Sequence, residues 1–474
     1  MHTKFASRLL IVFVAAALLF LAGPLQAAVS YPVMPFTVIK KLPVDPATID
    51  RKALVHEVAE TIKEHIEDYS NGYFTLMTAN DGMDPLPVEI IEFPTTPIQG
   101  QDEFAAVVEV LTAKDSKFYS QFGNGKAVSG PWSISVYTSS SLTAQMFKQL
   151  GDLLGIELGP EDPADYVLVS IINPLAVSKI SFQELNWWDN LKFNQHCKLV
   201  SDRLTDALNR ILAEQTTYDW RMNLNPMYNG LLPITDADLD KLTEDDITPT
   251  VVVPNADANS LADAFTGYVR ALAPMYNSGP LADLNQMVQV LFGSLFSWMD
   301  PDTPFDCDLT PYGGPILHFN NLDDFKTQFP GMVDSMFGPL WDQNLTTQGW
   351  KYGRRLQVGD AGNIANLMEM CTKFYAITAL SSGLHHTPAM PCMVSIYQDG
   401  DDAGLNMYTA KATFTFFFKD ATMMMELMNM PVQAFMFSAF PDFVYNDLAA
   451  LLNGSLVAAG VDPAYRFPIK RFSK

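Results

Sequence analysis

The sequence predicts an α+β protein of two related modules, each an antiparallel sheet with helices on one face, joined by a helical connector. Two observations predict this class. Helical patterns alternate with short period-two segments in both halves of the chain, and a stretch of the first half is repeated in the second. Hydrophobic residues form 48% of the chain and charged residues 18%, proportions that are typical of a packed globular protein.

The N-terminus has the pattern of a secretory signal peptide. A basic start with Lys4 and Arg8 precedes the apolar run LLIVFVAAALLFLAG and small residues that end at Ala27. A spanning helix needs roughly 20 apolar residues, and Pro24 ends this run early. We therefore expect cleavage of residues 1–27 and a periplasmic or secreted mature chain without an integral membrane segment.

Residues 28–180 form the first predicted module. Asp50 is placed to cap a helix in which Leu54, Val58 and Ile62 recur every four residues. The segment GYFTLMTAN then reads as a strand, and further strand patterns end with YVLVSIINP. The order of helix, strand, strand, helix, strand, strand predicts an antiparallel sheet with helices on one face.

Residues 181–285 differ in character and are predicted to be a helical connector. The segment CKLVSDRLTDALNRILAEQ places Leu204, Leu208 and Ile211 on one face of a helix. This first helix is a candidate to pack on the first module.

The second module, residues 286–474, repeats the pattern of the first. A stretch starting at Val107 aligns without a gap over 33 positions with one starting at Leu367, at a constant offset of 260. Both copies read strand, helical stretch, glycine, turn, proline, strand, so we interpret them as a duplication whose two modules pair within the chain. The identical pairs are Glu109 with Glu369, Thr112 with Thr372, Gly123 with Gly383, Pro131 with Pro391, Ser135 with Ser395, and Tyr137 with Tyr397.

The second copy resembles the domain-of-unknown-function 302 family. In that family a cysteine ends one strand, and a Pro-Cys turn starts a strand that reads Val-x-Val-Tyr-Glu-Asp-Gly. Cys371 falls on the first cysteine and Cys392 on the Pro-Cys pair, whereas Thr-Lys replaces the Asn-Pro that follows the first cysteine in the family. The first copy is degenerate, with Leu111 and Trp132 at the two cysteine positions. The resemblance implies an α+β fold and supplies no established activity.

The stretch GLHHTPAMPCMVSIY concentrates side chains that bind soft metals. Thiolate and thioether groups favour Cu(I), and imidazole suits copper or zinc, but the spacing matches no recognised metal motif. No cofactor is therefore predicted, and copper is kept as an alternative. The metal candidates are Cys392, His385, His386 and Met390, and the ligand or disulfide candidates are Cys371, Cys392, His385, His386 and Glu369.

A structural role for the cysteines is the competing interpretation. Strand alternation puts Cys392 on the same face as Val394 and Ile396, the face expected to be buried. Its counterpart in the first copy is Trp132, so this position serves packing in at least one copy. Cys371 and Cys392 can also form a disulfide if their Cα atoms lie within about 7 Å.

The sequence offers no catalytic constellation, because it contains neither a G-x-S-x-G elbow nor an H-E-x-x-H motif. A net charge of −23 makes nucleic acid a poor partner. We therefore expect an exported, acidic, Met-rich binding or accessory protein that recognises a small ligand or a periplasmic protein. The alternative is copper or thiol-redox handling by Cys371, Cys392, His385 and His386. An enzyme is the third hypothesis, with no nucleophile to nominate.

Overall fold

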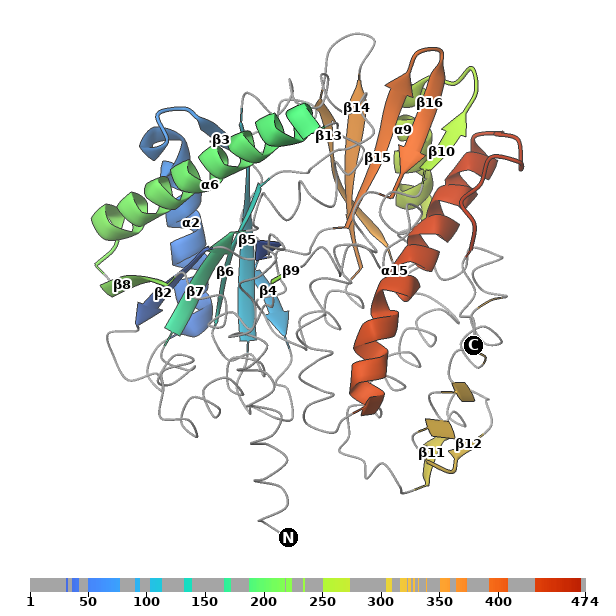
Figure 1. The fold of residues 1–474 in the computed structure, drawn as a ribbon, viewed down its shortest axis with the longest axis horizontal. Helices are drawn as coiled ribbons and strands as arrows, with labels where there is room; N and C mark the ends of the chain where they lie inside the picture. The colour runs from blue at the N-terminus through green and yellow to red at the C-terminus, as the bar shows by residue number, and fades with distance from the viewer. Residues whose placement is uncertain are drawn as a thin grey trace.

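The structure is a computed structural model, and it shows helices and antiparallel sheets (Figure 1). It describes residues 31–32, 36–41, 50–76, 90–93, 103–112, 132–138, 166–171, 187–217, 219–223, 233–234, 250–272, 304–308, 316–321, 323–324, 327–328, 331, 338, 350–358, 364–372, 392–407 and 431–469. The predicted signal peptide lies outside these residues. The α+β class predicted from the sequence is confirmed.

The first sheet follows the strand order β3-β5-β6-β7-β2-β8, with β4 also paired to β5. Its strands are β2 (Phe36–Lys41), β3 (Phe74–Leu76), β4 (Ile90–Phe93), β5 (Glu103–Thr112), β6 (Trp132–Thr138), β7 (Tyr166–Ile171) and β8 (Asp219–Asn223). The pairings between them are antiparallel. The helices α2 (Arg51–Tyr69) and α6 (Trp187–Gln215) pack against each other over one face of this sheet.

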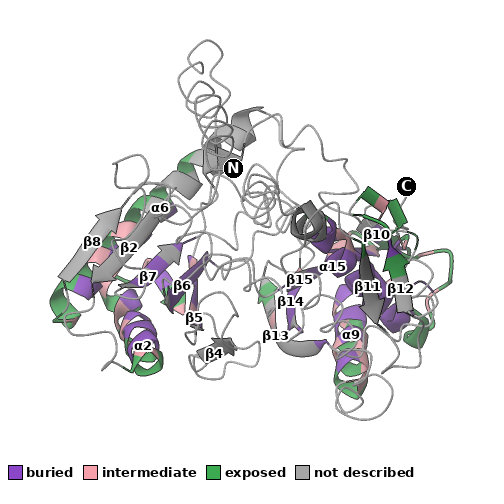
Figure 2. Ribbon diagram, turned by 90° about the horizontal axis from the view of Figure 1, so that it is seen from below, coloured by how far each residue is buried: buried purple, intermediate pink, exposed green. Residues whose placement is uncertain are grey.

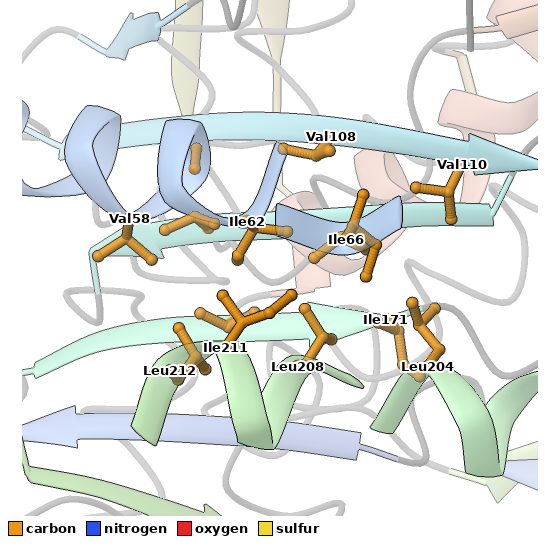
Figure 3. Close-up of a cluster of buried hydrophobic side chains, with 14 of the residues drawn as sticks. Val58, Ile62, Ile66, Val108, Val110, Ile171, Leu204, Leu208, Ile211 and Leu212 are labelled. Carbon is orange, nitrogen blue, oxygen red and sulfur yellow. The ribbon is translucent and has the colours of Figure 1, made fainter. Parts of the chain in front are cut away.

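The core of this module lies between the two helices and the sheet. The carboxylate of Asp50 accepts a hydrogen bond from the Ala53 N–H at 2.9 Å, as the capping prediction requires. The apolar stripes of α2 and α6 then meet alternate residues of β5, β6 and β7 (Figure 3). Burial of these stripes stabilises the helices on the sheet, because each buried methylene contributes about 0.8 kcal/mol.

The second sheet follows the order β10-β16-β15-β14-β13. Its strands are β10 (Thr250–Val253), β13 (Lys351–Val358), β14 (Ala365–Cys371), β15 (Cys392–Asp399) and β16 (Asp402–Asn406). The helix α9 (Ala258–Leu272) packs on this sheet and α15 (Pro431–Ala458) packs on α9. Buried residues run through the central strands of both sheets (Figure 2). Two small pairs lie apart from the sheets: β1 (Tyr31–Pro32) with β9 (Pro233–Ile234), and β11 (Phe305–Asp308) with β12 (Ile316–Phe319).

The two sheets share strand order and register. β5 and β6 pair Val107 with Ser135, and β14 and β15 pair Leu367 with Ser395, so the same positions meet at the offset of 260. β2 lies beside β7 and leads into α2, just as β10 lies beside β16 and leads into α9. Along the main path of each sheet the order is therefore the same: one strand and one helix precede four strands and a second helix, with β4 and the pair β11–β12 as additions. This is the pattern expected of a duplication.

The predicted connector, residues 181–285, contributes to both sheets. Its first helix, α6, packs on α2 as predicted, and β8 extends the first sheet. In contrast, β10 and α9 belong to the second sheet. The physical reason is the apolar stripe of α9, where Leu261, Phe265 and Val269 are buried and need a sheet face to cover them. The described residues of this segment are thus shared between the sheets and do not form a separate helical unit.

The helix α15 is buried along most of the length for which side chains are described. The residues that follow it run back over its surface: Asn453 Nδ2 donates to the Phe467 carbonyl at 2.9 Å, and Asn453 Oδ1 accepts from the Phe467 N–H at 2.8 Å. The Tyr445 hydroxyl donates to the carbonyl of Pro468 at 2.9 Å. None of the helices in the described ranges has the length and apolar character needed to cross a membrane.

Candidate functional site

The two cysteines predicted from the sequence lie near each other along neighbouring strands. Cys392 opens β15, is only 6% exposed, and stands opposite Met370 in the register of β14 and β15. Cys371 is the next residue of β14 and opposes Lys351 of β13. The prediction that Cys392 is buried with Val394 is confirmed. A disulfide between the cysteines, in contrast, stays a prediction, because the Cys371 side chain is outside the described part of the structure.

The remaining metal candidates, His385, His386 and Met390, lie in the segment 373–391, outside the described residues. Within the ranges that are described, no group of three or more His, Cys, Asp or Glu side chains could hold a metal ion. Copper binding by this stretch therefore stays a proposal. The Met-rich segment DATMMMELMNM also lies outside the described residues.

Glu369, the remaining candidate, has a counterpart in the first sheet. Glu109 is 6% exposed and lies opposite Ser133, while Glu369 is 2% exposed and lies opposite Met393. Strand alternation points both glutamates to the face away from α2 or α9, which we call the far face of each sheet. A buried carboxylate is costly unless it has polar partners, so its presence in both sheets indicates a specific polar requirement.

Each far face carries two more buried polar residues that are identical in the two copies. These residues are a serine and a tyrosine. Together with the glutamate they form what we call the first row, Glu109, Ser135 and Tyr137, and the second row, Glu369, Ser395 and Tyr397. Both serine side chains are fully buried, and their Oγ atoms have no hydrogen-bond partner in the part of the chain that the structure describes. A buried hydroxyl without a partner is unfavourable by about 1–3 kcal/mol, so we expect Ser135 and Ser395 to have a polar partner outside the described residues or in a ligand.

The second row also requires a glycine. A Cβ atom added to Gly404 of β16 would collide with the ring of Tyr397, because the tyrosine ring covers the Gly404 backbone. In the first sheet the corresponding partner of Tyr137 is Leu168. The two far faces therefore share their polar residues but pack the tyrosine against different neighbours.

Apolar residues at corresponding positions of the two sheets differ more than the row residues do. The core residues Val108 and Val110 correspond to Met368 and Met370, and Trp132 corresponds to Cys392, all of them buried. Packing requires apolar character and approximate volume and does not require identity. The rows are identical although they lie outside the helix-facing core, so packing alone does not account for them.

Sequence reasoning nominated Glu369 but passed over Glu109 and the row serines and tyrosines as site residues. The signal that could have found them was their identity between the copies combined with period-two spacing on one face. The chain matches no protein-family model, no curated protein and no solved structure in the comparisons. The resemblance to the domain-of-unknown-function 302 family thus stays a prediction, and the rows are identified from strand register, burial and the identity of corresponding residues.

Proposed function

We propose that this chain is an exported, non-catalytic binding or accessory protein built by duplication of one α+β module. The observation that carries the proposal is the pair of Glu–Ser–Tyr rows, which occupy the same register positions on the far faces of two sheets. Identical buried polar groups on a shared plan are what a duplicated binding module would keep. Export is inferred from the signal pattern of residues 1–27.

The chemistry of the rows favours a small polar ligand that presents hydrogen-bond donors. A carboxylate only accepts hydrogen bonds, whereas serine and tyrosine hydroxyls both donate and accept. Buried sites of this kind recognise a ligand through a few placed polar groups, because a wrong ligand leaves those groups unpaired. Copper or thiol-redox handling remains the second proposal, favoured by the thiolate, thioether and imidazole groups of the stretch GLHHTPAMPCMVSIY.

The test is mass spectrometry of protein purified from the compartment to which it is exported. We expect an intact mass that corresponds to cleavage near Ala27 and a native spectrum with a non-covalently bound small molecule. The double variant Glu109→Gln, Glu369→Gln should lose that adduct, because an amide replaces one acceptor oxygen by a donor. The matched control is Glu64→Gln, which changes an exposed carboxylate of α2 and should retain the adduct.

An intact signal segment would contradict export, and the absence of any adduct, or its persistence in the double variant, would contradict binding by the rows. Metal analysis and thiol alkylation of the same sample address the second proposal. If a copper adduct is found and disappears when Cys371 and Cys392 are both changed to Ser, copper handling would be favoured over ligand binding by the rows.

A further inference from the structure

The end of α15 turns the chain back over the helix. The Gly460 N–H donates to the carbonyl of Val457 at 3.0 Å, and the Val461 N–H donates to that of Leu456 at 2.9 Å. These are the bonds of a helix end that a left-handed residue reverses, and Gly460 has the required positive φ of 75°. The residues after α15 therefore begin their return path at the helix end itself.

A second turn directs the tail, which we define as residues 459–469, onto the helix. The Ala464 N–H donates to the carboxylate of Asp462 at 2.9 Å, and the Tyr465 N–H donates to the Asp462 carbonyl at 3.0 Å. Phe467, two residues beyond this turn, is buried beside α15. The path of the tail is thus set by signals in its own sequence.

The residue that receives the tail, Asn453, begins the N-glycosylation sequon Asn-Gly-Ser. Glycosylation joins an oligosaccharide to the side-chain nitrogen of such an asparagine. This nitrogen attacks the C1 carbon of a lipid-pyrophosphate-linked oligosaccharide, the C1–O bond to the pyrophosphate breaks, and one amide proton passes to a base of the transferase. The reaction therefore requires that the transferase reach the Asn453 side chain.

The folded chain engages both side chains of the sequon. Asn453 is only 9% exposed, its Nδ2 donates to the Phe467 carbonyl at 2.9 Å, and its Oδ1 accepts from the Phe467 N–H at 2.8 Å. Ser455 is 3% exposed, and its hydroxyl donates to the Leu452 carbonyl at 2.8 Å. The sequon also lies inside α15, so its backbone is helical. A transferase cannot reach these groups while the tail is in place.

We infer that a docked tail and an oligosaccharide on Asn453 exclude each other, so that this sequon accepts a glycan only in chains whose tail has not docked. Protein interiors are close-packed, and a buried amide leaves no room for even one sugar. A glycan on Nδ2 would therefore force Phe467 away from α15. In an exported chain that meets such a transferase, the sequon is a modification site that folding closes.

The inference is tested on the full-length chain, secreted from cells that glycosylate exported proteins, by mass spectrometry of the peptide that contains Asn453. We expect no glycan on this residue in the folded wild type. Phe467→Ala removes the buried ring of the tail and should raise the glycosylated fraction roughly tenfold or more, because the tail then opens more often. Tyr445→Phe is the milder variant, since it removes only the hydrogen bond to the Pro468 carbonyl and should raise this fraction less.

The matched control places a second sequon at the exposed end of the same helix. Val457→Asn with Ala459→Ser creates it at a position that is 51% exposed, and this position should carry a glycan in the folded protein. The control shows that the transferase reaches this part of the chain.

Two results would overturn the inference. One is a glycan on Asn453 in a protein whose tail stays docked, which slow exchange of the Phe467 amide with solvent would show. The other is an Asn453 that stays unmodified in both tail variants while the control sequon is modified. Neither result depends on a bound ligand, so this test and that of the proposed function fail separately.

Discussion

Single polar side chains hold the second module together at the place where α9 begins. Gln398 of β15 accepts a hydrogen bond from the Ala258 N–H at 2.9 Å and donates to the carbonyl of Asp402 at 2.8 Å. The Asn255 N–H donates to the carboxylate of Asp402 at 3.0 Å. These bonds join the turn before α9 to the turn between β15 and β16, so the entry of the helix is fixed by side chains from a distant part of the sequence.

The carboxylate of Asp257, the residue before α9, caps the N-terminus of this helix. The Ser260 N–H donates to Asp257 at 2.8 Å, and this bond, with that of the Ser260 hydroxyl at 2.9 Å, holds the pKa of the Asp257 carboxyl below its ordinary value. Since this pKa is lower in the folded than in the unfolded chain, the stabilisation is complete above the unfolded value of about 3.9 and is lost as the pH falls through the folded value.

We therefore predict that Asp257→Ala destabilises the protein by about 0.5–1 kcal/mol near neutral pH, and that the difference from wild type shrinks below pH ~4. Chemical denaturation at several pH values measures both. Asp257→Asn is the control, because its amide oxygen caps the helix without titrating in this range. A difference between wild type and the alanine variant that stays constant down to pH ~3 would contradict the assignment.

At the scale of elements, α9 is attached to its sheet by a polar network that reaches from the buried Asn366 to the surface. Asn259 Oδ1 accepts hydrogen bonds from Asn366 Nδ2 at 3.1 Å, Gln357 Nε2 at 2.9 Å and Arg355 Nη2 at 3.2 Å. Arg355 also donates to Asn366 Oδ1 at 2.8 Å, and one turn further along α9 it forms an ion pair with Asp263. The network fixes α9 over β13 and β14, in addition to the apolar stripe.

The hydrogen bonds of Asn259 and the ion pair of Asp263 should contribute unequally to the stability of the second module. We predict that Asn259→Ala destabilises the second module by about 1–3 kcal/mol, because it removes one acceptor from three donors, whereas Asp263→Ala should cost less than about 1 kcal/mol. The reason is exposure, since the Asp263 side chain is 73% exposed and its ion pair is screened by solvent. Thermal or urea denaturation compares them, and an equal loss in both variants would contradict the network as described.

Elements with a strong local pattern are the ones that the sequence predicts. The cap at Asp50 and the apolar residues at every fourth position identify α2, and the apolar stripe identifies α6. The alternation of apolar and polar residues identifies β6 and β15 and predicts which of their faces is buried. The sheet positions of β8 and β10 are not predicted, because a short apolar run such as Thr250–Val253 carries no information about its partner strand. The sequence does not reveal the rows for the same reason: the residues of a row become neighbours only when β5 pairs with β6, or β14 with β15.

At the scale of the whole molecule, the core described for the first module is built from residues of that module. The described cluster of the first module contains residues of α2, β3, β5, β6, β7 and α6 and none from the second module. Distant sites with no shared partners contribute additively to stability, so a change in one core should leave the other unaffected.

The tail that follows α15 gives the sharpest test of this separation. Asn453→Ala removes both hydrogen bonds that hold the buried Phe467 backbone, a loss of about 1–3 kcal/mol. Because the second module is less stable by this amount, we predict that the slowest amides of β14 and β15 exchange with solvent about 5- to 150-fold faster. The amides of β5 and β6 should keep their rates. Val457→Ala, an exposed change on the same helix, should alter neither sheet. Equal acceleration in both sheets would mean that the modules open together, and the two cores would then act as one cooperative unit.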